Sequence, residues 1–178
     1  MSKSQRIVLH NLRASYPHLF TPDQLSGKYT CDFILSKDSP ELPAFKEAIK
    51  AVYADAKAAN PSKNIECKVL RDGDIEKAAD AAFANKFFIK TTTSSPIIKQ
   101  NVFKRISDGP VEKIADGSEF FGGCNCSASL VVSWYSYQGK IGVHVLLNGV
   151  CREEGGEPFG FNGDASGDFM EDMPDEIM

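Results

Sequence analysis

Cationic and aromatic side chains alternate along much of this chain. Both kinds suit contact with a nucleic acid, because lysine and arginine pair with phosphates and flat rings stack on exposed bases at about 1–3 kcal/mol per base. The candidates, in chain order, are Arg13, Tyr16, Phe20, Lys28, Phe88, Lys90, Lys99, Phe103, Lys104, Arg105, Tyr135 and Tyr137. This mixture is typical of proteins that hold a single strand without reading its sequence. Taken one residue at a time, a solvated charged surface over an aromatic core is the better interpretation. Taken together with the acidic end of the chain, the pattern favours binding.

The charge of the chain is divided between a basic body and an acidic end. The formal net charge is −4, but no lysine or arginine follows Arg152. Nine of the 24 acidic residues lie beyond that point, so residues 1–152 hold 15 acids against all 20 basic residues, a balance of +5. A basic body of this kind attracts a polyanion such as a nucleic acid, whereas the acidic end repels one.

The acidic end has the composition of a tail. Past Phe161 the sequence is dominated by Gly, Asp, Glu and Met, which cannot bury enough apolar surface to fold. We therefore expect a folded domain over 1–160 and a flexible acidic tail over 161–178. Apolar side chains interrupt the acids, which suits docking into a basic groove with an apolar pocket, on a partner or on the protein's own cationic face. The predicted partner-binding residues are Asp168, Phe169, Glu171, Asp172, Asp175, Glu176 and Ile177.

The elements that must position the candidates are mainly strands. Ser127–Tyr137 and Lys140–Leu147 flank the pair Gln138-Gly139 and predict a β-hairpin. Because side chains alternate along a strand, the second run has one clean apolar face, and the first run places Tyr135 and Tyr137 together on one face. Most aromatics in hairpins belong to a core, so base stacking and core packing both stay open for these rings.

Other segments complete a small antiparallel barrel with helices beside it. The spacing of apolar residues predicts an amphipathic helix, capped by Ser39 and followed by a proline, and a second helix that follows the turn at Asp72-Gly73. Alternating β-formers predict the remaining strands. The predicted strands are Gln5–Ser15, Lys28–Ser36, Ile65–Leu70 and Lys86–Thr93, and the predicted helices are Ser39–Asn60 and Asp74–Asn85.

A series of short motifs carries a resemblance to a known family. They are, in order, Ala14–Phe20, Lys28-Tyr29, Arg71–Asp74, Ser94–Pro96, Phe121–Gly123 and Gly139–Val143. In this order the chain resembles a family of bacteriophage single-stranded DNA-binding proteins. The tail is similar to the acidic tip of bacterial single-stranded DNA-binding proteins, although it ends in Met178 where those proteins end in Phe.

The resemblance implies a mainly β, OB-fold-like barrel with accessory helices and a disordered acidic C-terminal tail. It implies a non-enzymatic protein without a cofactor, which holds single-stranded DNA (ssDNA) in a cleft during phage DNA replication or recombination. It further implies that the tail recruits phage or host replication and recombination proteins. The oligomeric state, a homodimer included, stays open.

Two other functions remain as alternatives. Glu66-Cys67-Lys68 has the Glu-x-Lys spacing of metal-dependent nucleases, in which the acid holds the metal and the lysine orients water. The upstream Asp-bearing turn that such a site requires is absent. A phage structural or scaffolding protein with a solubilising tail is the second alternative, and the basic body and interleaved rings count against it.

Cysteine usage and hydropathy predict a cytosolic protein, and the resemblance to a phage family implies the cytoplasm of the bacterial host. The five cysteines are odd in number and irregularly spaced, so reduced thiols are expected in place of a disulfide framework. Cys124-x-Cys126 is a single close pair and does not make a zinc site. The first ten residues lack a hydrophobic signal region, and no run is long enough to span a membrane.

Overall fold

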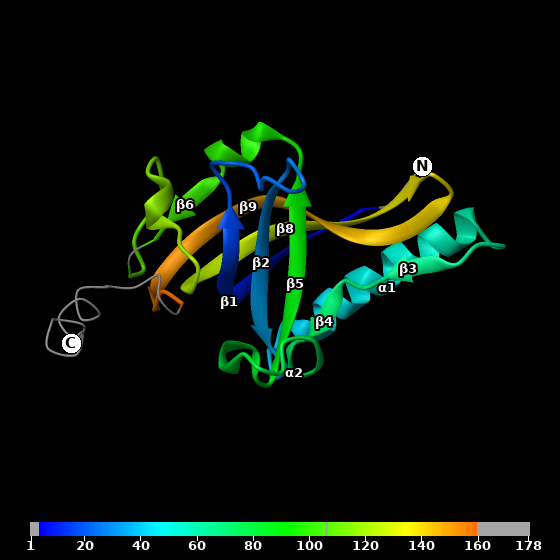
Figure 1. The fold of residues 1–178 in the computed structure, drawn as a ribbon, viewed down its shortest axis with the longest axis horizontal. Helices are drawn as coiled ribbons and strands as arrows, with labels where there is room; N and C mark the ends of the chain where they lie inside the picture. Colours follow the sequence, from blue (N-terminus) through cyan, green and yellow to red (C-terminus); the bar gives the residue numbers. More distant parts are fainter. Residues whose placement is uncertain (1–3, 106, 160–178) are drawn as a thin grey trace, which may run out of the picture.

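The computed structural model describes residues 4–105 and 107–159, and its centre is a closed barrel (Figure 1). The strand order is β5-β2-β1-β8-β9, and a parallel pairing of Thr92 on β5 with Leu146 on β9 closes the ring. This confirms the predicted OB-type barrel, a small five-stranded Greek-key structure. Its strands are β1 (Gln5–His18), β2 (Tyr29–Ser36), β5 (Lys86–Thr93), β8 (Cys124–Tyr137) and β9 (Lys140–Gly156).

Short elements extend the sheet on both sides of the barrel. The single strand predicted over Ile65–Leu70 is in fact two strands, because one pairs with β9 and the other with β5. The chain must therefore cross from one barrel strand to another between them. The short elements are β3 (Ile65–Cys67), β4 (Leu70–Asp72), β6 (Val102–Lys104), β7 (Glu112–Lys113) and the 3₁₀ turns η1 (Ala81–Phe83), η2 (Pro96–Gln100) and η3 (Gly117–Glu119).

Helix α1 (Leu42–Ala59) packs beside the barrel, as its narrow apolar stripe predicts. It begins two residues later than predicted, after Glu41 and not after Ser39. The buried side chains form the expected stripe of Leu42, Phe45, Val52 and Ala56. The indole Nε1 of Trp134 donates a hydrogen bond of 2.8 Å to Asp55, which fastens the helix to the β8–β9 hairpin.

The second predicted helix, Asp74–Asn85, is wrong for most of its length. Only α2 (Gly73–Glu76) and the separate turn η1 are helical there. The side chains of Asp72 and Asp80 each accept a hydrogen bond from the backbone two residues further on. Such local side-chain hydrogen bonds compete with a continuous helix. Two short helical segments therefore form where the periodicity alone predicts one helix.

The β8–β9 hairpin confirms the predicted turn and the predicted faces. Gln138 and Gly139 have φ angles of 50° and 79°, both positive as a type I′ hairpin turn requires, and Tyr137 pairs with Lys140. The predicted apolar set on β9 is buried throughout: Ile141, Val143, Val145 and Leu147. Strand β9 continues to Gly156, well beyond the predicted end, and curves along the barrel (Figure 1).

Strand β1 contains an irregularity that the alternation rule misses. Asn11 has a φ of 57°, and the register with β8 shifts between Leu9 and Leu12. Such a bulge inserts one residue, so Leu9, Leu12 and Ala14 are all buried although simple alternation puts Leu9 and Leu12 on opposite faces. The strand also continues to His18, past the end predicted before Pro17.

The predicted tail and its partner-binding residues, from Asp168 to Ile177, lie outside the described residues, so the division into 1–160 and 161–178 stays a prediction.

All five cysteines are free, and Cys31, Cys124 and Cys126 are buried in the barrel as small apolar side chains. No helix among the described residues is long and apolar enough to cross a membrane.

Candidate nucleic-acid interface

A groove of about 570 Å³ lies on the outer face of β2 and β5. The end of β1, the β1–β2 loop and β9 form its other walls. OB-folds bind oligonucleotides on the outer face of their second and third barrel strands, beside the loops that follow the first and fourth strands. In this chain those strands are β2 and β5. The polar and aromatic lining includes Tyr16, His18, Lys28, Asp32, Lys68, Lys90 and His144.

Strand register makes the floor of the groove polar. Thr30 pairs with Thr92 and Asp32 pairs with Lys90 across β2 and β5, and these four residues line the groove. The next pair along the same face, Ile34 with Phe88, is covered by Phe83. The Phe88 ring packs edge-on against the Phe83 ring, with centroids 5.5 Å apart. The open polar floor therefore ends where the segment after β4 covers the sheet.

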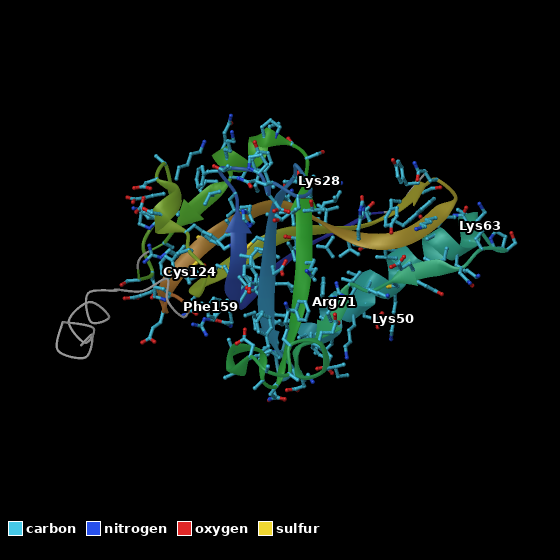
Figure 2. The ribbon with its side chains drawn as sticks, in the orientation of Figure 1. Lys28, Lys50, Lys63, Arg71, Cys124 and Phe159 are labelled. Carbon is cyan, nitrogen blue, oxygen red and sulfur yellow. The ribbon has the colours of Figure 1, made fainter. Side chains whose placement is uncertain are left out.

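Three lysines surround this floor. Lys28 and Lys68 are exposed and form no ion pair within 4–105 and 107–159, while the Nζ atom of Lys90 lies 3.9 Å from Asp32. Lys28 lies beside the end of β5 (Figure 2). The sequence analysis predicted contacts from Lys28 and Lys90. It considered Lys68 only for the nuclease alternative, because nothing local shows that the junction of β3 and β4 lies beside the groove.

Tyr16 projects from the wall formed by the end of β1. Its side chain is 63% exposed, and its φ of 50° lies in the left-handed region that non-glycine residues seldom occupy. Strained backbone of this kind persists where the surrounding structure holds it, and it is concentrated at functional sites. The exposed ring is available to stack on a base, and such a contact stays a prediction for this residue.

Tyr135 and His144 form a second aromatic surface on the β8–β9 hairpin. Their ring centroids are 5.0 Å apart with an interplanar angle of 42°. A Cβ atom at Gly142, which pairs with Tyr135, would lie 2.6 Å from the tyrosine hydroxyl, so the glycine makes room for the ring. Burial first, and then the charge of Lys28, lowers the pKa of His144, which favours the neutral imidazole. Tyr137 is 66% exposed near the hairpin turn.

His144 is a groove residue that the sequence analysis missed and treated as structural. The available signal was its position on β9, where it shares the mixed face with Gly142 opposite the tyrosines of β8. That position gives proximity to Tyr135, but it does not show that the face is open. The contribution of His144 depends on the barrel bringing β9 beside β5.

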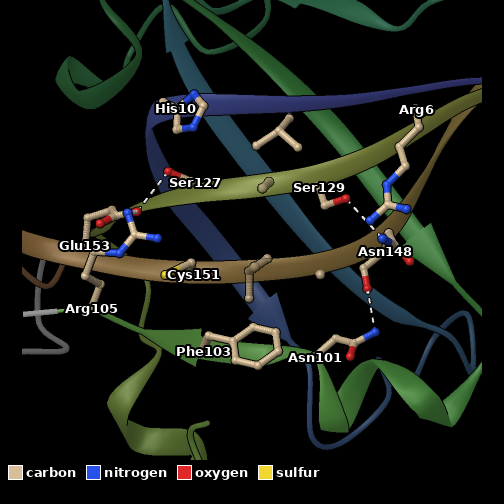
Figure 3. A pocket seen from close by; sticks show the side chains of 14 residues that line it. Arg6, His10, Asn101, Phe103, Arg105, Ser127, Ser129, Asn148, Cys151 and Glu153 are labelled. Carbon is tan, nitrogen blue, oxygen red and sulfur yellow. Dashed lines mark hydrogen bonds and ion pairs between the residues drawn. The ribbon is translucent and has the colours of Figure 1, made fainter. Parts of the chain in front are cut away.

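Phe103 and Arg105 lie in a different pocket, of about 320 Å³, on the outer faces of β1, β8, β9 and β6 (Figure 3). Polar side chains in this back pocket bond to one another. Arg105 pairs with Glu153 at 3.8 Å, and Ser127 donates to the same carboxylate at 3.0 Å. The amide of Asn148 donates to Ser129 at 3.0 Å.

Phe88 is a correction to the predicted set. Its side chain is 1% exposed and lies in a small core with Ile34 and Phe83, so it cannot stack on a base. Phe20 is partly buried and packs against the main core, next to Gly117. Both rings pack with hydrophobic cores, which is the alternative interpretation of the aromatic residues.

Three predicted cations lie away from the floor of the groove. Arg13 donates to the carbonyl oxygens of Gly123 and Glu157 and lies over the Phe159 ring, 4.1 Å from its centroid. It therefore fastens the last described segment to the barrel. Lys104 forms an ion pair with Glu119. Lys99 is exposed, and its Nζ atom lies 5.5 Å from the centroid of the Tyr29 ring.

The nuclease alternative has no metal site in the part of the chain that is described. Glu66 is exposed on β3, and no three His, Cys, Asp or Glu side chains among the described residues gather in a way that could hold a metal ion. The groove that does assemble is lined instead by lysines, Tyr16, two histidines and the carboxylates of Asp23 and Asp32.

An OB barrel with a basic, aromatic groove on its second and third strands defines the class of oligonucleotide-binding proteins. Comparison with known proteins gives the family. Residues 5–178 match the family of the Enterobacter phage Enc34 ssDNA-binding protein, and the chain belongs to that family. This confirms the resemblance found in the motifs.

Individual relatives and solved structures are similar to this chain over most of its length. Protein p50 of Acyrthosiphon pisum secondary endosymbiont phage 1 is 28% identical over 94% of both chains. The structure of the bacteriophage Enc34 single-stranded DNA-binding protein in complex with ssDNA is similar with a TM-score of 0.68 and 22% identity, over 87% of this chain and 89% of that one. The bacteriophage T7 single-stranded DNA-binding protein gp2.5 has a TM-score of 0.57 and 16% identity over 97% of both chains. The structural likenesses establish a shared fold.

Proposed function

We propose that this chain binds ssDNA in the groove over β2 and β5, and protects it during phage DNA replication or recombination in the host cytoplasm. The observation that carries the proposal is the combination of free lysines and an exposed, strained tyrosine on the face that OB-folds use for oligonucleotides. Membership of the Enc34 ssDNA-binding family supports the same ligand.

Phosphates and bases would have separate contacts. Lys28 and Lys68 are placed to follow the phosphates along the walls, and binding there releases condensed counterions from the DNA. Tyr16 on one wall, and His144 on another with the Tyr135 ring beside it, would present ring faces to bases. Because every base has a flat face, such stacking tolerates any sequence.

The test compares two double variants of the full chain. The groove variant is Lys28→Gln with Lys68→Gln, and the matched control is Lys50→Gln with Lys63→Gln, on and just beyond α1 (Figure 2). Fluorescence anisotropy of a labelled oligo-dT is measured across a salt series. We expect the groove variant to reduce the salt slope by roughly 1.4, since each phosphate contact on a single strand contributes about 0.7. Equal slopes for both variants would place the DNA elsewhere.

We further propose that the acidic tail recruits replication or recombination proteins of the phage or its host. The alternation of acids with Phe169, Met170, Met173 and Ile177 supports docking into a basic, partly apolar groove. A truncation after Phe161 should bind oligo-dT as well as or better than the full chain, because it loses an anionic competitor. It should also lose capture of replication proteins from an infected lysate. Loss of oligo-dT binding on truncation would contradict this role.

A further inference from the structure

The floor of the groove contains a carboxylate with unused hydrogen-bonding capacity. The Asp32 side chain is 16% exposed, yet its carboxylate accepts no hydrogen bond from any described residue. Its one ion-pair partner, the Nζ atom of Lys90, is 3.9 Å away and beyond hydrogen-bond distance. Enclosed carboxylates usually accept several hydrogen bonds, so this exception requires an explanation.

Strand geometry directs this carboxylate at the ligand. Asp32 lies between Cys31 and Phe33, both fully buried in the barrel, so its own side chain is on the opposite, groove-facing side of β2. Its cross-strand neighbour Lys90 faces the same groove. A strand bound here would therefore contact the Asp32 carboxylate directly.

The negative charge determines which part of the DNA can occupy the floor. A phosphate placed against Asp32 would meet a like charge in a partly desolvated site, where repulsion is stronger than in water. The free lysines, Lys28 and Lys68, offer phosphates a better position along the walls. The strand is then bound with phosphates at the walls and base edges toward Asp32.

We propose that Asp32 is a base-reading residue, which accepts hydrogen bonds from base N–H groups and prefers guanine. Guanine carries two adjacent donors, N1–H and the N2 amino group, which one carboxylate can accept together. Cytosine and adenine offer one amino group beside an acceptor. Thymine N3–H lies between two carbonyl oxygens that repel a carboxylate. The inference rests on the proposed ssDNA-binding function and adds a base preference to it.

The test uses a labelled oligo-dT of about 15 nucleotides in three forms. One is unmodified, one carries dispersed guanines, and one carries hypoxanthine at the same positions, which lacks only the N2 amino group. For the full chain we expect the guanine form to bind about fivefold or more tightly than oligo-dT, the lower end for a bidentate contact, with hypoxanthine in between. Asp32→Asn should remove this ranking and strengthen binding of unmodified oligo-dT, because a negative charge leaves the groove.

Asp23 provides a matched control inside the same groove. Its carboxylate already accepts a hydrogen bond from the Ser26 hydroxyl at 3.1 Å, so Asp23→Asn should preserve the guanine preference. Equal binding of all three oligonucleotides by the unmodified chain would overturn the inference and leave the proposed function intact. The absence of binding to any of them at low salt would overturn the proposed function itself.

Discussion

The groove over β2 and β5 and the back pocket over β1, β8, β9 and β6 differ in how their polar side chains are satisfied. In the back pocket, Glu153 is bonded by Ser127 and Arg105. In the groove, Asp32 accepts no hydrogen bond and Lys28 forms no ion pair among the described residues. Side chains already paired with one another cost free energy to separate, so the groove is the better prepared for a charged ligand. Cations and rings alone do not make this distinction, because both concavities contain them.

The largest expected effect is on DNA affinity when two charges are removed from each region. Lys28→Gln with Lys68→Gln should weaken oligo-dT binding about tenfold or more at moderate salt, because two phosphate contacts are lost. Arg6→Gln with Arg105→Gln, the same charge change in the back pocket, should leave affinity within about twofold. Anisotropy titrations of both variants measure this. A comparable loss from the back-pocket variant would show that the strand extends around the barrel.

The next effect comes from the exposed ring of the groove. Tyr16→Ala should weaken binding by about 1–3 kcal/mol, the contribution of one stacked base, whereas Tyr16→Phe retains the ring and should bind almost normally. Phe103→Ala, which removes a ring from the back pocket, should change affinity little. The same titrations test the three variants, and a large loss for Phe103→Ala with none for Tyr16→Ala would reverse the assignment of the two regions.

A smaller effect is expected when the Tyr135 ring, which lies against the groove residue His144, loses its place. In Gly142→Ala the new Cβ would overlap the hydroxyl of Tyr135 at 2.6 Å, so the ring must move from its place beside His144. We expect a stability loss of about 1 kcal/mol in chemical denaturation and a weaker affinity for oligo-dT. Gly139→Ala, at the turn, meets no atom within 4 Å and tests strain at a positive φ without displacing a ring. Unchanged DNA binding in Gly142→Ala would show that Tyr135 does not contact the strand.

The smallest effect concerns stability, and its sign should differ between the two regions. Burial raises the pKa of Asp32, an effect opposed in part by the charges of Lys90, Lys77, Arg71 and His18. The folded state therefore binds this proton more tightly than the unfolded state does, and stability falls as pH rises through the interval between the two pKa values. At neutral pH Asp32→Asn should raise Tm, and the gain should shrink as the pH is lowered below the folded pKa.

Glu153→Gln is the counterpart in the back pocket. Its carboxylate is bonded by Ser127 and Arg105, so losing its charge should lower Tm slightly. Thermal unfolding of Asp32→Asn and Glu153→Gln at neutral and acidic pH measures the two changes in Tm. A fall in Tm for Asp32→Asn at neutral pH would show that the groove carboxylate stabilises the fold, contrary to the comparison.

The sequence by itself determined the elements whose signals are local. The run of strand formers over Lys86–Thr93, the alternation along Lys140–Leu147 and the turn at Gln138-Gly139 each depend on neighbouring residues, and each was predicted correctly. The apolar stripe of α1 is a local signal of the same kind. The basic body with its acidic end is likewise a property of composition. These features, with the ordered motifs, were sufficient to predict an OB-type barrel and its class of ligand.

Only the tertiary structure decided which side chains share the groove. Lys68, Lys90 and His144 lie far apart in the sequence and meet because β5 pairs with β9 when the barrel closes. Phe88 has the same local pattern as a groove residue, yet the segment carrying Phe83 covers it. Exposure and proximity depend on contacts between distant segments, so no window of sequence contains that information.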